Sequence, residues 1–128
     1  MSNSKEFHLM TKRLLVIFSI IHASLFAQTA PNLVVTDLNG VSHNVYDYLD
    51  EGKTVLLDFF ILNCIPCKEG AEYMDVFWKK YGPDDSDQIQ ILSIEVNNNS
   101  DEIVEETTNN WGMNNPVVNL NDIPESYI

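Results

Sequence analysis

The sequence predicts an α/β fold, in which strands alternate with helices, for the part of the chain that follows residue 27. Residues 54–62 are nearly continuously apolar, which fits a central strand buried on both faces, and residues 89–96 form a second strongly apolar strand. Between them, residues 66–81 show the three- and four-residue spacing of an amphipathic helix. Residues 101–111 are predicted to form a second helix. Strands joined through helices imply right-handed crossovers and a layered structure.

A short β-hairpin is predicted ahead of these elements. Residues 30–40 form a strand that runs into a turn at Asn39 and Gly40, a pair that favours tight hairpin turns. Residues 41–45 return as the second strand. Residues 47–50 then predict a single helical turn, which ends before the next strand.

The first long strand, residues 54–62, contains one acidic side chain, Asp58, among apolar neighbours. A carboxylate in a buried strand needs a partner or a chemical role, so Asp58 is a candidate site residue. The alternative is a side chain near the strand end that faces water. The helix predicted at residues 66–81 follows, and Gly82 and Pro83 end it.

The second half of the chain continues the alternation of strands and helices. Residues 89–96 form the second apolar strand, and Asn99 with Glu102 matches the pattern of a helix N-cap pair. Residues 101–111 then form an acidic helix, and residues 115–120 form a short third strand.

The first 27 residues have the composition of a secretory signal peptide. Basic residues precede a short apolar run, residues 14–27, and the polar Gln28 follows it. The run is shorter than the roughly 20 residues that a membrane-spanning helix needs. The alternative is a buried N-terminal helix. We therefore expect residues 1–27 to be a signal peptide and residues 28–128 to form one domain that is periplasmic or secreted and has no membrane span.

The charge of the chain is strongly acidic. The sequence has 7 Lys and Arg residues against 19 Asp and Glu residues, a net charge of −12 at pH 7. Such a surface repels nucleic acids and anionic membranes, so neither is expected as a partner. An acidic surface is typical of a soluble protein outside the cytoplasm, and we expect this one to be a monomer. The alternative is that the negative charge serves to select a partner.

Cys64 and Cys67 are the only cysteines, and three kinds of site could use them: a redox-active pair, a structural disulfide or part of a metal site. A disulfide across two intervening residues closes a very small loop and stabilises little. A metal site needs more ligands than two thiolates, and His43, the only histidine after residue 27, is expected at the surface. The acidic loops at residues 84–87 and 95–101 lack the spacing of a calcium loop. We therefore predict a redox-active disulfide, with no metal and no other cofactor.

The predicted position of the pair, at the junction between a buried strand and a helix, suits thiol–disulfide exchange. The N-terminus of a helix stabilises a thiolate, and the thiolate of Cys64 is the expected nucleophile. Cys67 lies one helical turn later and is placed to resolve the mixed disulfide. Pro66 fits the first helical turn, where its missing N–H costs nothing. Asp58 could exchange a proton with Cys67.

Two segments, A-P-N-L-V-V-T-D-L-N-G (residues 30–40) and L-D-E-G-K-T-V-L-L-D-F-F-I-L-N-C-I-P-C-K (residues 49–68), resemble the thioredoxin-like thiol–disulfide oxidoreductases of the bacterial envelope. These are the TlpA-like group, which is close to the alkyl-hydroperoxide-reductase and thiol-antioxidant class. The resemblance implies a three-layer α/β/α fold with a central mixed sheet and an N-terminal hairpin, and partners that are protein thiols or disulfides of the cell envelope. It implies that Cys64 attacks, that Cys67 resolves and that Asp58 is the buried aspartate of the family.

The chain departs from this family at the residues around the cysteines. Family members usually carry Trp before the first cysteine, where this chain has Asn63, so an aromatic wall beside the thiol is expected to be missing. The pair between the cysteines, Ile65 and Pro66, replaces the more common Pro-Pro or Gly-Pro and is expected to tune the redox potential. Asn63, Ile65 and Pro66 are therefore the predicted partner-binding residues.

The C-terminal part of the family fold is not recognisable in the sequence. The family closes its site with a cis-proline loop, a β-hairpin and a final helix, and the expectation is that this hairpin and helix are missing here. Two other functions are open. One is a non-catalytic binding module that keeps the fold. The other is a peroxiredoxin-like peroxidase, although such enzymes carry Thr at the position of Ile61.

Overall fold

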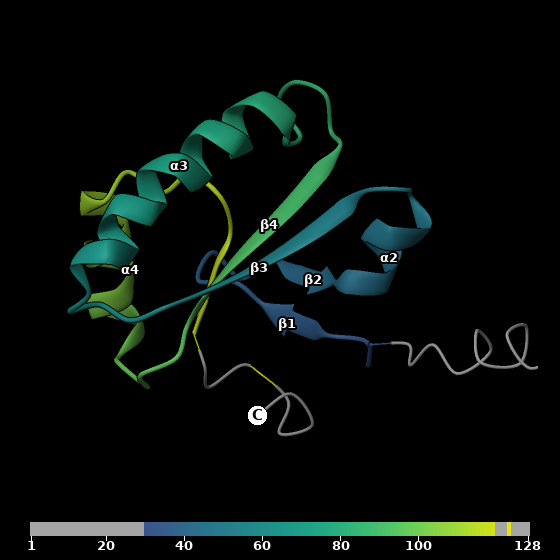
Figure 1. Cartoon of the computed structure of the whole chain (residues 1–128). Coiled ribbons are helices and arrows are strands. Elements are labelled where there is room, and N and C mark those ends of the chain that lie inside the picture. Colours follow the sequence, from purple (N-terminus) through teal and green to yellow (C-terminus); the bar gives the residue numbers. More distant parts are fainter. Residues whose placement is uncertain (1–29, 120–122, 124–128) are drawn as a thin grey trace, which may run out of the picture. The chain divides into compact units, whose positions relative to one another are not determined.

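The computed structural model describes residues 30–119 and residue 123, and their elements follow the predicted order (Figure 1). The predicted signal peptide at residues 1–27 lies outside the described residues. The elements are β1 (Val34–Thr36), β2 (Ser42–Asn44), α2 (Val45–Asp50), β3 (Thr54–Phe60), α3 (Ile65–Tyr81), β4 (Ile89–Glu95), α4 (Asp101–Asn110) and β5 (Val117–Asn119).

The larger sheet has the strand order β3–β4–β5, and all its described strands are parallel. The register places Asp58 of β3 opposite Ser93 of β4, and Ser93 opposite Val117 of β5. Strands β1 and β2 form a separate antiparallel pair. The predicted α/β class is confirmed, and within the described residues the antiparallel pairing lies in the hairpin instead of in the larger sheet.

Asp37 builds the turn of the hairpin. Its Oδ1 accepts hydrogen bonds from the backbone N–H groups of Asn39 and Val41, both at 2.9 Å. Gly40 has a φ of +79°, a conformation that glycine adopts without steric cost. The turn predicted at Asn39 and Gly40 is therefore present, and a carboxylate two residues earlier holds it.

The expectation that His43 lies at the surface is wrong, because only 4% of this residue is exposed. Its Nε2 lies 3.1 Å from Oδ2 of Asp37, and its Nδ1 lies 2.7 Å from the hydroxyl of Tyr48. Burial raises the pKa of Tyr48, although the nearby Lys53 opposes that shift. Both ring nitrogens of His43 thus have partners, one from α2 and one from the hairpin turn, which allows the ring to be buried.

Helix α3 has Cys64 as its N-cap and Gly82 as its C-cap. A Cβ atom at Gly82 would lie 2.4 Å from the carbonyl oxygen of Trp78, so only glycine fits at this end. Within the helix, Asp75 accepts hydrogen bonds from Lys79 at 2.6 Å and from Asn114 at 2.7 Å. Burial raises the pKa of Asp75, but the hydrogen bonds from Lys79 and Asn114 outweigh it and the net pKa is lowered. Asn114 thereby ties α3 to the loop before β5.

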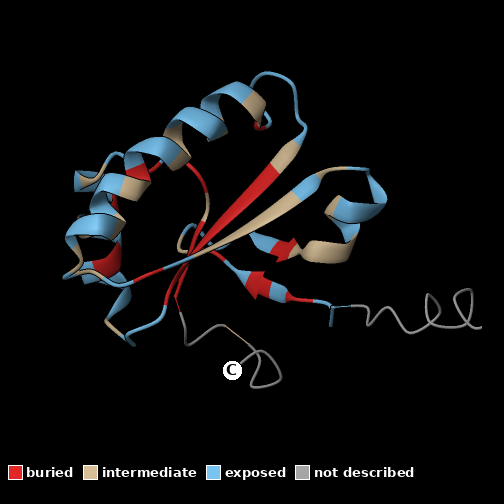
Figure 2. Ribbon diagram, in the orientation of Figure 1, coloured by how far each residue is buried: buried red, intermediate tan, exposed pale blue. Residues whose placement is uncertain are grey.

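Two apolar clusters cover the two faces of the larger sheet, and β4 is buried along nearly its whole length (Figure 2). One cluster joins the sheet to α3 and α4, and its buried residues are Phe60, Ala71, Val104, Met113 and Val117. The other joins the sheet to the hairpin, and its buried residues are Leu33, Val35, Leu92, Ile94 and Val118. The sheet is thus a middle layer, with helices on one face and the hairpin on the other.

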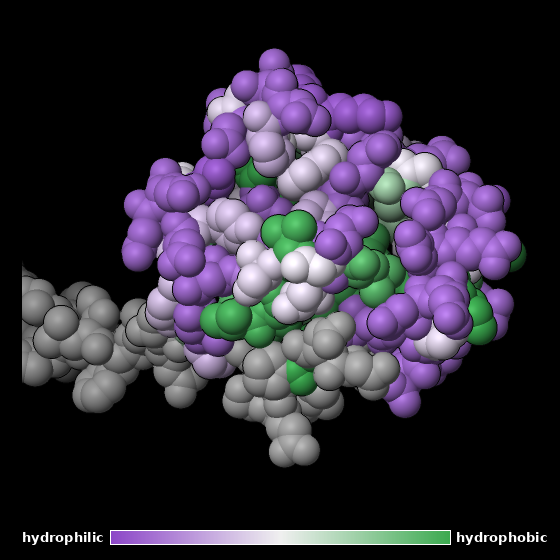
Figure 3. Space-filling model, turned by 180° about the vertical axis from the view of Figure 1, so that it is seen from behind, coloured by the Kyte–Doolittle hydropathy of each residue, from purple (hydrophilic) through white to green (hydrophobic). Residues whose placement is uncertain are grey.

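Seen from behind, most of the described surface on that side is hydrophilic, and hydrophobic residues gather near its centre (Figure 3). Among residues 30–119, no helix combines the length and the apolar character that crossing a bilayer requires.

Candidate active site

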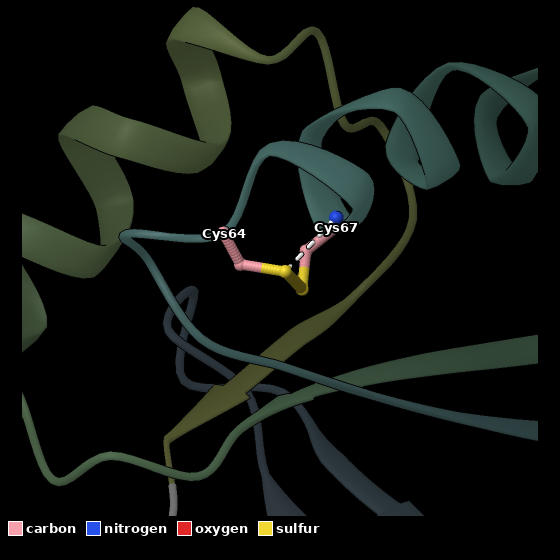
Figure 4. The surroundings of a disulfide bond; sticks show 2 residues. All are labelled: Cys64 and Cys67. Atoms are coloured by element: carbon pink, nitrogen blue, oxygen red, sulfur yellow. Dashed lines mark hydrogen bonds between the residues drawn. A yellow bond between two sulfur atoms is a disulfide. The ribbon is translucent and has the colours of Figure 1, made fainter.

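Cys64 and Cys67 form a disulfide at the N-terminus of α3 (Figure 4). Cys64 is the N-cap of the helix, with an extended backbone, and its Sγ accepts a hydrogen bond of 3.1 Å from the backbone N–H of Cys67. Pro66 occupies the first helical turn. A sulfur atom that caps a helix receives both an N–H donor and the positive end of the helix dipole. The same contacts would stabilise a negative charge on this sulfur after reduction of the disulfide.

The two cysteines differ in their surroundings. Cys64 lines an open groove on the surface, together with Asn63 and Ile65. Both cysteines are partly buried, but Cys67 packs against the apolar cluster that contains Phe60 and Ala71 and is not among the residues that line the groove. A molecule in the groove would therefore meet Cys64 before Cys67.

Asp58 lies in the middle of β3 and is partly buried. Successive side chains of a strand point to opposite faces, so Asp58 points to the same face as Phe60, which belongs to the cluster under α3 and α4. Cys67 packs against that same cluster. The structure thus places Asp58 and Cys67 on one side of the sheet.

Asp58 is the end of a hydrogen-bonded chain of side chains that crosses the sheet. The hydroxyl of Ser93 donates to Oδ2 of Asp58 at 3.1 Å, and Nδ2 of Asn115 donates to the oxygen of Ser93 at 2.9 Å. Ser93 is fully buried, and only 4% of Asn115 is exposed. Sequence reasoning missed both residues, although aligning the two parallel strands would have placed Ser93 beside Asp58.

The groove beside Cys64 has a volume of about 310 Å³. Its lining residues are Leu62, Asn63, Cys64, Ile65, Lys68 and Trp111. Of the three predicted binding residues, Asn63 and Ile65 line it, whereas Pro66 is exposed but is not among the lining residues. Trp111 comes from the C-terminal end of α4, and nothing in the local sequence indicates that it lies beside the cysteines.

No group of three or more histidine, cysteine or carboxylate residues within the described part of the chain could hold a metal ion.

No protein-family model matches the chain. Several curated relatives are similar to it in sequence, among them two thiol–disulfide oxidoreductases named ResA. The protein from Geobacillus kaustophilus is 38% identical over 71 residues, which cover 53% of this chain and 36% of that protein. The protein from Bacillus anthracis is 33% identical over 88 residues, which cover 69% of this chain and 47% of that protein. The chain thus spans between about a third and a half of the length of these relatives.

Solved structures of thiol–disulfide proteins share the fold. A secreted thiol–disulfide isomerase from Corynebacterium glutamicum superimposes with a TM-score of 0.61 at 20% identity, covering 71% of this chain and 55% of that chain. StoA from Bacillus subtilis superimposes with a TM-score of 0.57 at 17% identity, covering 71% and 65% respectively. The described part of the chain therefore has the thioredoxin-like α/β fold that its sequence predicts, and its sequence is similar to that of known thiol–disulfide oxidoreductases.

Proposed function

We propose that this protein is a thiol–disulfide oxidoreductase that exchanges electrons with protein disulfides through Cys64 and Cys67. The observation that carries the proposal is the capping of α3 by the sulfur of Cys64, which accepts the N–H of Cys67 and lines a surface groove. The names of the sequence relatives support the same reaction class. A sulfur at a helix N-terminus that lines a surface groove favours exchange chemistry over an inert structural disulfide.

The reaction begins with the reduced pair. The thiolate of Cys64 attacks one sulfur of a substrate disulfide, so that a new bond joins Cys64 to the substrate and the other substrate sulfur leaves as a thiolate that takes up a proton. Cys67 then attacks the sulfur of Cys64, which re-forms the disulfide seen in the structure and releases the second substrate thiol. The substrate gains two electrons and two protons, and the reverse sequence oxidises a dithiol.

Asp58 is proposed as the group that accepts the proton of the Cys67 thiol when this cysteine attacks. Its position under α3, on the face against which Cys67 packs, supports this role. Ser93 donates to one oxygen of the carboxylate and fixes its orientation. Asn115 fixes the hydroxyl of Ser93 in turn.

Replacing Asp58 with asparagine keeps the shape of the side chain and removes the proton acceptor. We expect the resolution of the mixed disulfide by Cys67 to slow by on the order of ten-fold or more near neutral pH, and less at alkaline pH, where the thiol ionises unaided. Rapid-quench alkylation across a range of pH measures this rate. Asp84→Asn, in an exposed loop, is the matched control. If the Asp58→Asn protein had the same rate and pH profile as the Asp84→Asn control, the role of the Asp58 carboxylate would be purely structural.

The proposal extends to the organisation and location of the protein. We propose that residues 1–27 are a signal peptide, that residues 28–128 are the functional domain, and that its partners are protein thiols or disulfides of the cell envelope. The basic and apolar N-terminal pattern supports export, and the acidic charge supports a soluble form. An open groove beside Cys64 favours an enzyme over a non-catalytic binding module, and Ile61 disfavours a peroxidase.

The reduction potential of the Cys64–Cys67 pair tests the proposed reaction. The purified protein is equilibrated in glutathione buffers, and its free thiols are trapped by alkylation. A midpoint between about −280 and −120 mV, the range of catalytic pairs, is the expected result. A midpoint far below about −300 mV, or a pair that never exchanges with glutathione, would instead identify a structural disulfide.

A further inference from the structure

The groove beside Cys64 carries three side chains that the reaction itself does not use. Ile65, Lys68 and Trp111 line it together with the reactive cysteine. Ile65 and Lys68 come from the first turns of α3, and Trp111 is the C-cap residue of α4. Residues from two separate helices therefore surround the atom that would meet a substrate.

Trp111 is held in place as one wall of this groove. Its ring packs edge-on against Phe60 with the ring centroids 5.9 Å apart and an interplanar angle of 61°. Its backbone N–H donates to the carbonyl oxygen of Thr107 at 3.0 Å. An aromatic ring fixed in this way loses little conformational entropy when an apolar group packs on it. Trp111 thus supplies, from a distant segment, the aromatic surface that Asn63 does not provide.

Ile65 offers apolar surface next to Cys64. It is 77% exposed, more than any other large hydrophobic residue of the described chain. Contact with an apolar side chain of a bound partner would remove this exposed isoleucine surface from water, and this burial would favour binding.

Lys68 gives the groove a positive charge. It is the only charged residue among those that line the groove. Lys53 and Lys79 form ion pairs with acidic residues, whereas Lys68 forms none within the described part of the chain. In a protein with a net charge of −12, an unpaired lysine beside the reactive sulfur selects for a carboxylate on the partner.

We propose that Trp111, Ile65 and Lys68 form a docking site for substrate polypeptides in which the disulfide-bonded cysteine has an apolar residue and an acidic residue as close neighbours. The apolar side chain lies against Trp111 and Ile65, and the carboxylate pairs with Lys68. This inference rests on the proposed thiol–disulfide exchange and names the class of substrate that the site takes.

Two synthetic peptides test the docking site. Each carries one cysteine linked by a disulfide to the same chromophoric thiol, so that reduction releases colour. In one peptide the cysteine stands between leucine and glutamate, and in the other between serine and lysine. The reduced protein is assayed with both peptides and with a small symmetric disulfide. We expect kcat/KM for the leucine–glutamate peptide to exceed that for the serine–lysine peptide by about ten-fold.

Substitutions then assign the preference to the three residues. Trp111→Ala and Lys68→Glu should each lower the ratio of the two kcat/KM values several-fold, and Lys68→Glu should raise the rate with the lysine peptide. Trp111→Phe keeps an aromatic ring and should retain most of the preference, and Ile65→Ser changes an exposed side chain that does not threaten folding. Lys80→Glu, which reverses an exposed charge on the same helix outside the groove, is the matched control and should leave the ratio unchanged.

The outcomes separate the docking site from the reaction. Equal rates with both peptides, in a protein that reduces the small disulfide, would overturn the docking site and leave the exchange reaction standing. A preference that survives Trp111→Ala, Ile65→Ser and Lys68→Glu would also overturn it. A wild-type protein that reduces none of the three disulfides would overturn the proposed function, and the docking site with it.

Discussion

Replacing Cys64 with serine is expected to reduce thiol–disulfide exchange to the uncatalysed background. Cys64 is the cysteine that lines the groove, and its sulfur receives the N–H of Cys67. A serine hydroxyl does not ionise near neutral pH and forms no disulfide, so the first step of the reaction is lost. The rate of reduction of a disulfide-bonded model protein measures the effect.

Cys67→Ser is the matched substitution one helical turn away. It removes the resolving thiol but leaves the nucleophile, so the protein should still attack a substrate and then stay joined to it through Cys64. Non-reducing electrophoresis shows such a complex directly, and a reductant releases it. A Cys64→Ser protein that keeps its activity, or a complex that forms through Cys67 alone, would reverse the roles of the two cysteines.

The largest expected loss of stability comes from Ile94→Ala in β4. Ile94 is completely buried, in the cluster that joins the larger sheet to the hairpin. Removing three carbon atoms from such a site costs about 2–5 kcal/mol, which is a large share of the roughly 5–15 kcal/mol that stabilises a typical domain. Urea denaturation measures the change in the free energy of unfolding.

Ile103→Ala is the control for this substitution, because the same side chain on α4 is 52% exposed. Its effect should lie within about 0.5 kcal/mol of zero. Equal losses from the two substitutions would mean that the packing between the sheet and the hairpin contributes little to stability.

The elements with strong periodicity could be predicted closely from the sequence. The strand expected at residues 54–62 is β3 (Thr54–Phe60), and the strand expected at residues 89–96 is β4 (Ile89–Glu95). The burial on both faces expected for residues 54–62 is wrong, because β3 lies at an edge of the described sheet and only its Phe60 is buried, whereas β4 lies in the middle and is buried. Continuous apolar runs of this length between loops leave few other solutions. The helix expected from residue 66 begins one residue earlier, because the sulfur of Cys64 takes the N-cap position.

Features that depend on contacts between distant segments could not be predicted in this way. The burial of His43 depends on Asp37 and Tyr48, which satisfy both of its ring nitrogens. The position of Trp111 beside Cys64 depends on how α4 packs on the sheet. A local sequence pattern carries no information about contacts between distant segments. The same local sequence in another fold would lie at the surface.

The hydrogen bond from Cys67 to the sulfur of Cys64 also has a consequence for the backbone. Because the atom that caps α3 is the atom that changes oxidation state in the proposed reaction, the stability of the first turn of this helix should depend on the redox state. A thiolate is a stronger acceptor than a disulfide sulfur, so the amide proton of Cys67 should be best protected from solvent exchange in the reduced protein. The backbone of the first turn of α3 should therefore differ in stability between the two redox states.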